Sequence, residues 1–128
     1  MQFENFFIPK KKRSRKMSVS IYYSCELGDY LTDEQVFSVN NIIDKYNKDF
    51  PFEISSEDFG FYTKIECNKK IEGSTKLPSE EDYILDVLFY WLECLTELRQ
   101  IIPNDSWSVN LDDTTLEWNS SEGWELPL

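Results

Sequence analysis

Carboxylate side chains are the residues of this sequence whose type and spacing come closest to a chemical site. Along residues 79–102, steps of four, seven, four and three place a row of acids and one amide on a single stripe of a helix: Asp82, Asp86, Glu93, Glu97 and Gln100. Three interpretations suit this row: a solvated helix face, an acidic strip that docks a basic surface, or a pair of ligands for a divalent cation. Hard cations need several converging oxygens, and the sequence has no calcium-loop spacing, so we predict no metal site.

A second acidic group lies near the C-terminus, at Asp105, Asp112, Asp113, Glu117, Glu122 and Glu125. Asp112 and Asp113 are adjacent and have the composition of a tight turn. Glu117 and Glu125 are expected to point outward from the terminal strands, so that acids line an exposed sheet surface. Such a surface can imitate a row of phosphates and fill a nucleic-acid-binding cleft. Its enzymatic counterpart, a glycosidase-like carboxylate pair, needs a separation that the sequence does not fix.

Other forms of catalysis have little support in the residue types. The chain contains no histidine, which removes the usual activation of a serine or cysteine nucleophile and most zinc sites. Its four glycines are isolated, so there is no phosphate-binding loop. The three cysteines, Cys25, Cys67 and Cys94, are odd in number and widely spaced, which favours reduced, buried thiols in a cytoplasmic protein. We therefore predict a protein without catalytic residues, metal or cofactor.

The charge is distributed unevenly along the chain. The formal net charge is −11, yet six of the thirteen Lys and Arg side chains lie between Lys10 and Lys16. Residues 17–128 carry seven basic and 23 acidic side chains, a net charge of −16. A surface this acidic repels nucleic acid and anionic membranes, and it attracts a basic partner over a distance that salt reduces. The alternative is that the acidity serves solubility alone.

Residues 1–17 differ in composition from the rest of the chain. The run KKKRSRK has no apolar period and is expected to be disordered. It could be a nuclear-localisation or nucleic-acid-binding patch, or an extension upstream of the true start, because Met17 directly precedes a strand pattern. We expect a basic leader over residues 1–17 and a single domain over residues 18–128.

The remaining elements are arranged around one long helix, predicted from Ser79 to Ile102. Ser79 is placed to cap its first turn, the acids that follow suit the positive end of the helix dipole, and Pro103 ends it. Its apolar residues recur at three- and four-residue steps and cover more than one side: Ile84, Leu85, Val87, Leu88, Phe89, Trp91, Leu92, Cys94, Leu95, Leu98, Ile101 and Ile102. Acids interrupt this apolar run, so it does not predict a membrane span.

Strand patterns and one further helix complete the predicted fold. Residues 18–25 alternate as a half-buried strand, and Thr32 and Gln35 form a capping box for a helix that runs to about Lys48. Further strands are predicted over residues 50–54, 59–67, 71–77, 106–111, 116–118 and 124–126, the last three with inward-facing Trp107, Trp118 and Trp124. The order β-α-β-β-β-α-β-β-β predicts a two-layer α+β fold, with two helices packed on one face of a mainly antiparallel sheet.

Two stretches of the sequence resemble a known class of small proteins. The stretch GSTKLPSEED leads into the central helix, and WSVNLDDTTLEWNSSEGWELP ends the chain. In style they are similar to the acidic immunity proteins of bacterial polymorphic-toxin and contact-dependent-inhibition systems. The resemblance covers about residues 17–128. It implies a protein that binds and neutralises a cognate toxin domain, and it assigns no residue a role.

Our leading hypothesis is therefore a cytoplasmic, non-enzymatic protein whose acidic surface occludes a basic site on a protein partner, such as a nuclease toxin. The candidate partner-binding acids are Asp86, Glu93, Glu97, Asp112, Asp113 and Glu117. Tyr22, Tyr62 and Tyr90 are the aromatic residues expected to stay partly exposed and to anchor the partner. We expect the core to bind neither nucleic acid nor a membrane, and we leave its oligomeric state open.

Two other functions stay open at this point. A pocket between the sheet and the central helix, with converging tyrosine and carboxylate groups, would indicate a small-ligand-binding or enzymatic domain. Self-association that covers the wide apolar helix would instead indicate a structural or adaptor subunit.

Overall fold

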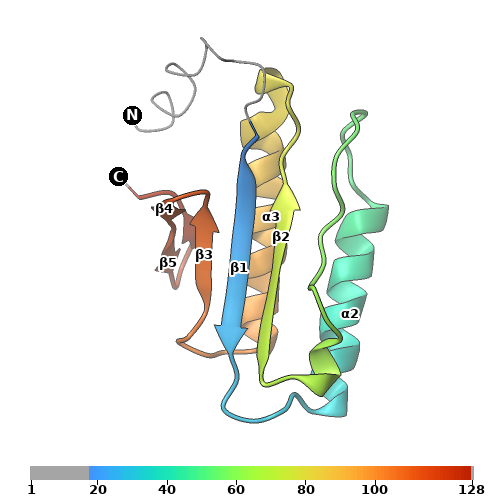
Figure 1. The fold of residues 1–128 in the computed structure, drawn as a ribbon, viewed down its shortest axis with the longest axis vertical. Helices are drawn as coiled ribbons and strands as arrows, with labels where there is room; N and C mark the ends of the chain where they lie inside the picture. The colour runs from blue at the N-terminus through green and yellow to red at the C-terminus, as the bar shows by residue number, and fades with distance from the viewer. Residues whose placement is uncertain (1–17, 128) are drawn as a thin grey trace.

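The computed structural model describes residues 18–127, and the basic leader predicted over residues 1–17 lies outside that range. The elements follow in the order β1 (Ser20–Glu26), α2 (Asp33–Lys48), the 3-10 helix η3 (Ile65–Cys67), β2 (Lys70–Lys76), α3 (Glu81–Ile101), β3 (Ser108–Leu111), β4 (Thr114–Thr115), β5 (Glu117–Asn119) and β6 (Gly123–Glu125). One sheet has the strand order β2-β1-β3-β4, and β5 and β6 form a separate pair. All of these pairings are antiparallel, so the predicted α+β class is confirmed (Figure 1).

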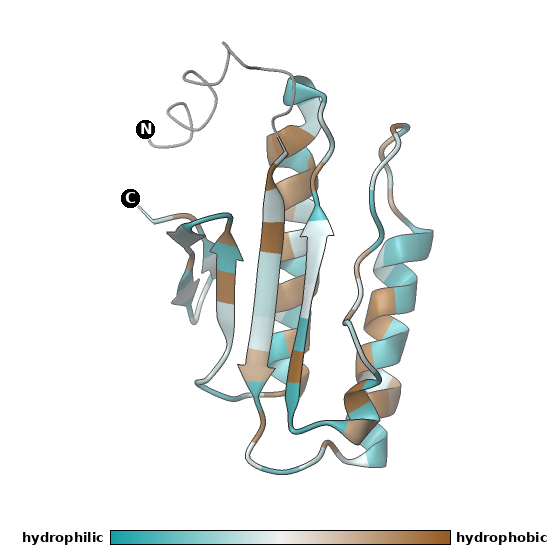
Figure 2. Cartoon of the chain, viewed as in Figure 1, coloured by the Kyte–Doolittle hydropathy of each residue, from teal (hydrophilic) through white to brown (hydrophobic). Residues whose placement is uncertain are grey.

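The central strand of the larger sheet is β1, because β2 and β3 pair with its two edges. Its side chains alternate between the two faces: Ile21, Tyr23 and Cys25 are buried, whereas Tyr22 is exposed. The buried residues form the inner face, which α3 covers, and the other face is the outer face (Figure 1). A similar alternation is visible as brown and teal bands along β3 in Figure 2.

The long helix α3 supplies the core, as the sequence predicts, but its start differs. Its buried residues are Ile84, Val87, Leu88, Trp91, Leu92, Cys94, Leu95 and Leu98. Ser79 does not cap it: Glu80 occupies the N-cap position with extended backbone and no side-chain capping bond. Because the helix begins one residue later than a Ser79 cap requires, the serine hydroxyl is displaced from the free amides of the first turn.

The second helix, α2, begins at the predicted capping box and packs against α3. The Gln35 amide donates to Thr32 Oγ1 at 3.1 Å, and the Thr32 amide donates to Gln35 Oε1 at 2.9 Å. Hydrogen bonds between the two helices include one from Gln35 Nε2 to the Ile101 carbonyl at 3.4 Å and one from the Tyr90 hydroxyl to the Tyr46 carbonyl at 2.7 Å. In Figure 1, α2 stands beyond the β2 edge of the sheet.

The strands predicted over residues 50–54 and 59–67 are wrong. This segment is irregular apart from η3, and its backbone groups find other partners. The Asn47 side chain on α2 exchanges two hydrogen bonds with the backbone of Phe59, at 2.9 and 3.0 Å. At the free edge of β2, the Tyr62 amide donates to the Glu72 carbonyl at 2.9 Å, and the Lys76 amide donates to Glu57 Oε1 at 2.7 Å. The segment therefore covers an exposed sheet edge without extending the sheet.

The predicted C-terminal meander divides into two sheets. The β5–β6 pair leaves the larger sheet and packs on α3, where the Trp124 amide donates to Thr96 Oγ1 at 3.3 Å. Gly123 has a φ of +92°, and a Cβ there would lie 2.5 Å from Thr96 Oγ1, so only glycine suits this contact. Trp124 is buried as predicted, but Trp118 is only partly buried, with the Arg99 guanidinium 4.4 Å from its ring centre.

Candidate functional site

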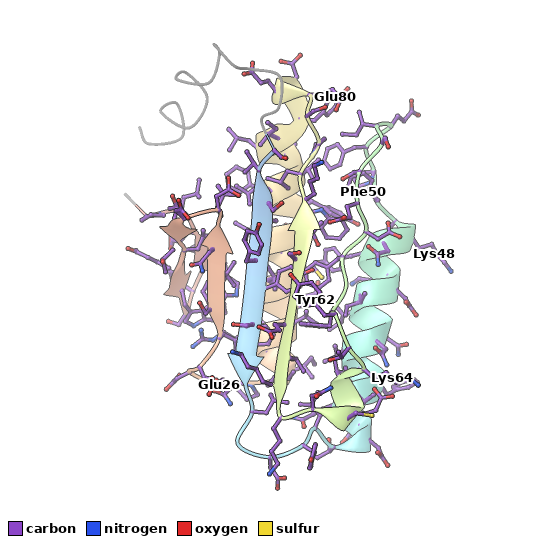
Figure 3. The ribbon with its side chains drawn as sticks, viewed as in Figure 1. Glu26, Lys48, Phe50, Tyr62, Lys64 and Glu80 are labelled. Atoms are coloured by element: carbon purple, nitrogen blue, oxygen red, sulfur yellow. The ribbon has the colours of Figure 1, made fainter. Side chains whose placement is uncertain are left out.

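The outer face of the larger sheet carries a shallow hollow of about 120 Å³. Its lining includes Tyr22 and Asn110, which are paired across β1 and β3, and a row across β2, β1 and β3 that consists of Glu72, Ser24 and Ser108. Tyr62 adds a third side to this hollow, from the irregular segment between α2 and β2, and Figure 3 labels it alongside β2. Edges of Tyr23 and Gly73 complete the lining.

Two tyrosine rings at this hollow are accessible to a partner. Tyr22 is 46% exposed and Tyr62 is 62% exposed. The Tyr62 hydroxyl donates to Ser74 Oγ at 2.8 Å, and its backbone amide is held by the Glu72 carbonyl. Because both ends of this residue are bonded to β2, its ring has a fixed position before anything binds.

Gly73 determines how close the Tyr62 segment lies to β2. A Cβ at position 73 would lie 2.2 Å from the Gly60 carbonyl oxygen and 3.1 Å from the Phe61 Cα. The Tyr23 hydroxyl, on the inner face, donates to the same Gly60 carbonyl at 2.8 Å. A residue without a side chain is therefore required for the segment to reach its position, and the segment in turn places Tyr62.

The lining of the hollow combines apolar ring surface with several hydrogen-bond acceptors. Glu72 is the charged residue among the lining residues. Lys70 Nζ lies 3.9 Å from Glu72 Oε1 and 4.0 Å from Glu26 Oε2, both at the outer limit of an ion pair. Asn110 Oδ1 is buried and has no hydrogen-bond donor within the described part of the chain. Serine and tyrosine hydroxyls add further acceptors.

The predicted acidic row on α3 has two different environments. Asp86 and Glu93 are exposed on the outside of the helix. Glu97 instead faces α2, where the Tyr46 hydroxyl donates to its Oε2 and Lys45 Nζ lies 3.7 Å from its Oε1. The Glu97 carboxylate therefore contributes to the contact between the two helices.

The predicted acids of the C-terminal region are likewise not equivalent. Asp112 lies in the turn between β3 and β4 with a φ of 51°. Its amide donates to the Ser20 carbonyl at 2.9 Å, and the Ser20 amide donates to its Oδ1 at 3.0 Å. Asp112 thus joins this turn to the start of β1. Asp113 and Glu117, which follow in the sequence, are exposed.

Tyr90 differs from the other two predicted tyrosine anchors. Its side chain is only partly exposed and packs in an aromatic cluster, with its ring centre 5.1 Å from Trp91 and 5.6 Å from Phe50. Burial raises its pKa, and its hydroxyl is already bonded to the backbone of α2. It belongs to the helical layer, so the sheet hollow contains two of the three predicted tyrosines.

The cysteines give no support to nucleophilic chemistry. Cys25 and Cys94 are buried, and burial raises the pKa of both thiols, with the nearby Glu97 raising that of Cys94 further. These thiols stay protonated at neutral pH, whereas a nucleophile needs a thiolate. Cys67 is exposed, contrary to the prediction, because it lies in η3 instead of a strand. Between residues 18 and 127, no group of three or more acidic or cysteine side chains is arranged to hold a metal ion.

Sequence reasoning missed six residues that line the hollow: Tyr23, Ser24, Glu72, Gly73, Ser108 and Asn110. The alternation pattern does place Ser24, Ser108 and Asn110 on outward faces of their strands. The pattern does not specify which strands pair. The sequence predicts that residues 71–77 pair with residues 59–67, whereas in the structure β2 pairs with β1. That pairing brings Glu72 next to Ser24.

Within residues 18–127, neither helix combines the length and apolar character that crossing a membrane requires. Comparisons of the chain with family models, with curated proteins and with solved structures each give no match.

Proposed function

We propose that this protein is a non-enzymatic, cytoplasmic binding protein that neutralises a basic protein partner, as toxin immunity proteins do. The observation that carries the proposal is the net charge of −16 over residues 17–128. Of the few cations in this range, Lys45, Lys70 and Arg99 already lie 3.4–4.0 Å from carboxylates of the same chain. The remaining negative charge attracts a basic protein and accelerates its association.

We assign the docking surface to the outer face of the sheet. Neither helix covers this face, and it presents the exposed rings of Tyr22 and Tyr62 beside a hollow. Tyrosine is enriched among the residues that dominate interface energies, since it contributes a large contact area and loses little conformational entropy. The hydrogen bond of Tyr62 to Ser74 reduces that loss further.

The predicted acids then divide into two roles. Asp86, Glu93, Asp113 and Glu117 are exposed, and we propose that they supply long-range attraction. Asp112 and Glu97 have hydrogen-bond partners within the fold, so their removal is expected to affect stability as well as binding.

The small-ligand and enzymatic alternative has weaker support. The interface between the sheet and α3 is filled by fully buried side chains, among them Ile21, Leu88 and Trp91. The hollow on the opposite face measures about 120 Å³, whereas pockets for small-molecule ligands are typically about 300–1,000 Å³. Such a hollow suits one side chain of a partner better than a separate metabolite.

Self-association through α3 also has weaker support. Of the apolar residues predicted along this helix, Leu85 and Phe89 are the large ones left exposed, because the sheet, α2 and β6 cover most of the others. Two exposed apolar side chains are normal for the surface of a protein that does not self-associate.

The test begins with capture by the tagged full chain from a lysate of the native cell, washed at low and at high salt. We expect one stoichiometric basic protein, to be identified by mass spectrometry and produced separately. Its association rate constant should fall steeply with ionic strength, while its dissociation rate constant changes little. A chain in which Asp86, Glu93, Asp113 and Glu117 are replaced by their amides should associate more slowly even at low salt.

Two results would contradict the proposed function. One is the absence of a stoichiometric partner at either salt concentration although the chain is folded and monomeric. The other is a captured partner whose association rate is independent of ionic strength and of the four substitutions.

A further inference from the structure

We propose that the hollow on the outer face of the sheet binds one arginine side chain of the partner. This inference rests on the proposed function, because it names the group by which a basic partner is held. It is tested separately, with a small arginine probe in place of the partner.

The size of the hollow agrees with a single side-chain head group. Its volume is about 120 Å³, and it is open to solvent on the uncovered face of the sheet. A planar guanidinium group can enter from that side without displacing a structural element.

The two aromatic rings favour a cation. Tyr22 and Tyr62 both line the hollow and are both substantially exposed. A guanidinium group packs against tyrosine rings by cation–π attraction and by stacking, and it does so more readily than the strongly hydrated ammonium of lysine. The hydrogen bond from the Tyr62 hydroxyl to Ser74 holds one ring in place beforehand, which lowers the entropy cost of binding.

The polar groups of the lining favour a ligand with many donors. Glu72 supplies a carboxylate, and Asn110 Oδ1 has no donor from residues 18–127. The Ser24 and Ser108 hydroxyls can accept as well. Arginine has five N–H donors in a planar arrangement and no acceptor, so its hydrogen-bonding groups complement these acceptors. Lys70 lies 3.9 Å from Glu72, which leaves the carboxylate able to form a shorter bond with an incoming guanidinium.

The experiment is an NMR titration of the ¹⁵N-labelled full chain with N-acetyl-arginine amide at constant ionic strength. We expect saturable shifts of the backbone amides of Tyr22, Ser24, Glu72 and Asn110. N-acetyl-citrulline amide has nearly the same shape without the charge, and it should bind at least about fivefold more weakly because cation–π attraction is lost. N-acetyl-lysine amide should also bind more weakly than the arginine probe.

Matched variants locate the site. Glu72→Gln should weaken binding of the arginine probe about tenfold, since it removes a charge-assisted hydrogen bond. Glu80→Gln removes the same charge from an exposed residue at the start of α3, labelled in Figure 3, and should change the affinity less than about twofold. Tyr62→Ala should weaken binding about two- to fivefold through loss of one ring.

Equal binding of the arginine and citrulline probes would overturn the proposal, and so would shifts spread over all acidic residues. Equal effects of Glu72→Gln and Glu80→Gln would also overturn it, and equal binding of the lysine probe would refute the choice of arginine. Each of these outcomes leaves the capture of a basic partner unaffected, so failure of the arginine site is distinguishable from failure of the proposed function.

Discussion

Tyr22 and Tyr23 are consecutive residues of β1, yet their side chains have opposite environments. Tyr23 is 2% exposed on the inner face, and its hydroxyl contacts Thr75 Oγ1 at 2.8 Å and donates to the Gly60 carbonyl at 2.8 Å. Tyr22 is 46% exposed on the outer face, in line with Ser74 and Asn110 on the neighbouring strands. One tyrosine is thus enclosed by the fold, and the other is accessible to a partner.

The two faces of this sheet therefore differ in their hydrogen bonding and exposure, and under the proposed function the inner face serves stability and the outer face serves binding. The inner face packs against α3, and the buried polar groups of Tyr23 and Thr75 are hydrogen-bonded within the chain. The outer face keeps two exposed rings, a carboxylate and an amide oxygen that lacks a donor from residues 18–127. Since the side-chain period of a strand is two, substitutions at neighbouring positions should change different properties.

The largest effect is expected at Gly73, where the two faces are linked. Gly73→Ala places a Cβ 2.2 Å from the Gly60 carbonyl oxygen, so the segment that carries Tyr62 must move away from β2. We expect the free energy of unfolding to fall by about 3 kcal/mol, as for severe overpacking. Urea denaturation measures this change.

Gly60→Ala is the matched control, because a Cβ at position 60 has no atom within 4 Å. It should change the free energy of unfolding by no more than about 1 kcal/mol. Equal destabilisation by both variants would show that chain flexibility, and not the close approach of the segment to β2, determines stability here.

A smaller effect is expected from the hydroxyl of Tyr23. Tyr23→Phe removes its contacts with the Gly60 carbonyl and with Thr75 Oγ1. The loss should lower the free energy of unfolding by about 1–2 kcal/mol, because it leaves buried polar atoms with fewer partners. Tyr22→Phe, one residue earlier and on the outer face, should change it by less than about 0.5 kcal/mol in the same urea experiment. Similar values for both variants would refute the separation of the two faces.

Alkaline pH tests the inner face in another way. Burial raises the pKa of Tyr23 well above its ordinary value of 10.0, since the interior penalises the phenolate. Below pH 10.0, the ordinary value, Tyr23 keeps its proton in both the folded and the unfolded chain, and the stability that its burial contributes is fully present. Above it, the unfolded chain loses the proton first, so the free energy of unfolding falls as pH rises.

In the wild-type chain, the free energy of unfolding should begin to fall near pH 9, because burial also raises the pKa of Cys94 from an ordinary value of 9.0. In Tyr23→Phe the decline above pH 10 should be shallower by up to about 1.4 kcal/mol per pH unit, the value for one proton. Urea unfolding curves between about pH 8 and about pH 11 cover this window. Identical slopes in both proteins would mean that Tyr23 ionises equally easily in the folded and unfolded chain.

The sequence predicts the individual helices and strands better than the tertiary contacts between them. The capping box of Thr32 and Gln35, the apolar periodicity of α3 and the alternation of β1 are local, so a pattern of residues is sufficient to recognise them. Residues 59–67 also alternate, but Gly73 and Asn47 hold this segment close to β2 and α2 in an irregular form. These are tertiary contacts between residues distant in sequence, and they override the strand pattern.

The same limit applies to the candidate site. The acidic charge is the basis of the proposed basic partner, and the alternation of residues 18–25 predicts the outward position of Tyr22. Tyr62 is exposed as predicted, but it lies in an irregular segment and not in the predicted strand. The hollow depends on β1 pairing with β2 on one side and β3 on the other, which aligns Glu72, Ser24 and Ser108 in one row. No short-range pattern specifies which strands are neighbours, so Glu72 was not among the predicted acids.

The smallest expected effect concerns Tyr62 on the outer face. It distinguishes the contribution of the ring to probe binding from that of the hydroxyl. Tyr62→Phe keeps the ring and removes the bond to Ser74, which water can replace because the residue is 62% exposed. The free energy of unfolding should change by less than about 0.5 kcal/mol. Affinity for N-acetyl-arginine amide should stay within about twofold if the ring supplies the attraction, whereas Tyr62→Ala should lower it about two- to fivefold. Equal losses in both variants would mean that the hydroxyl holds the probe or positions the ring, and the outer face would then depend on its hydrogen bonds as strictly as the inner face does.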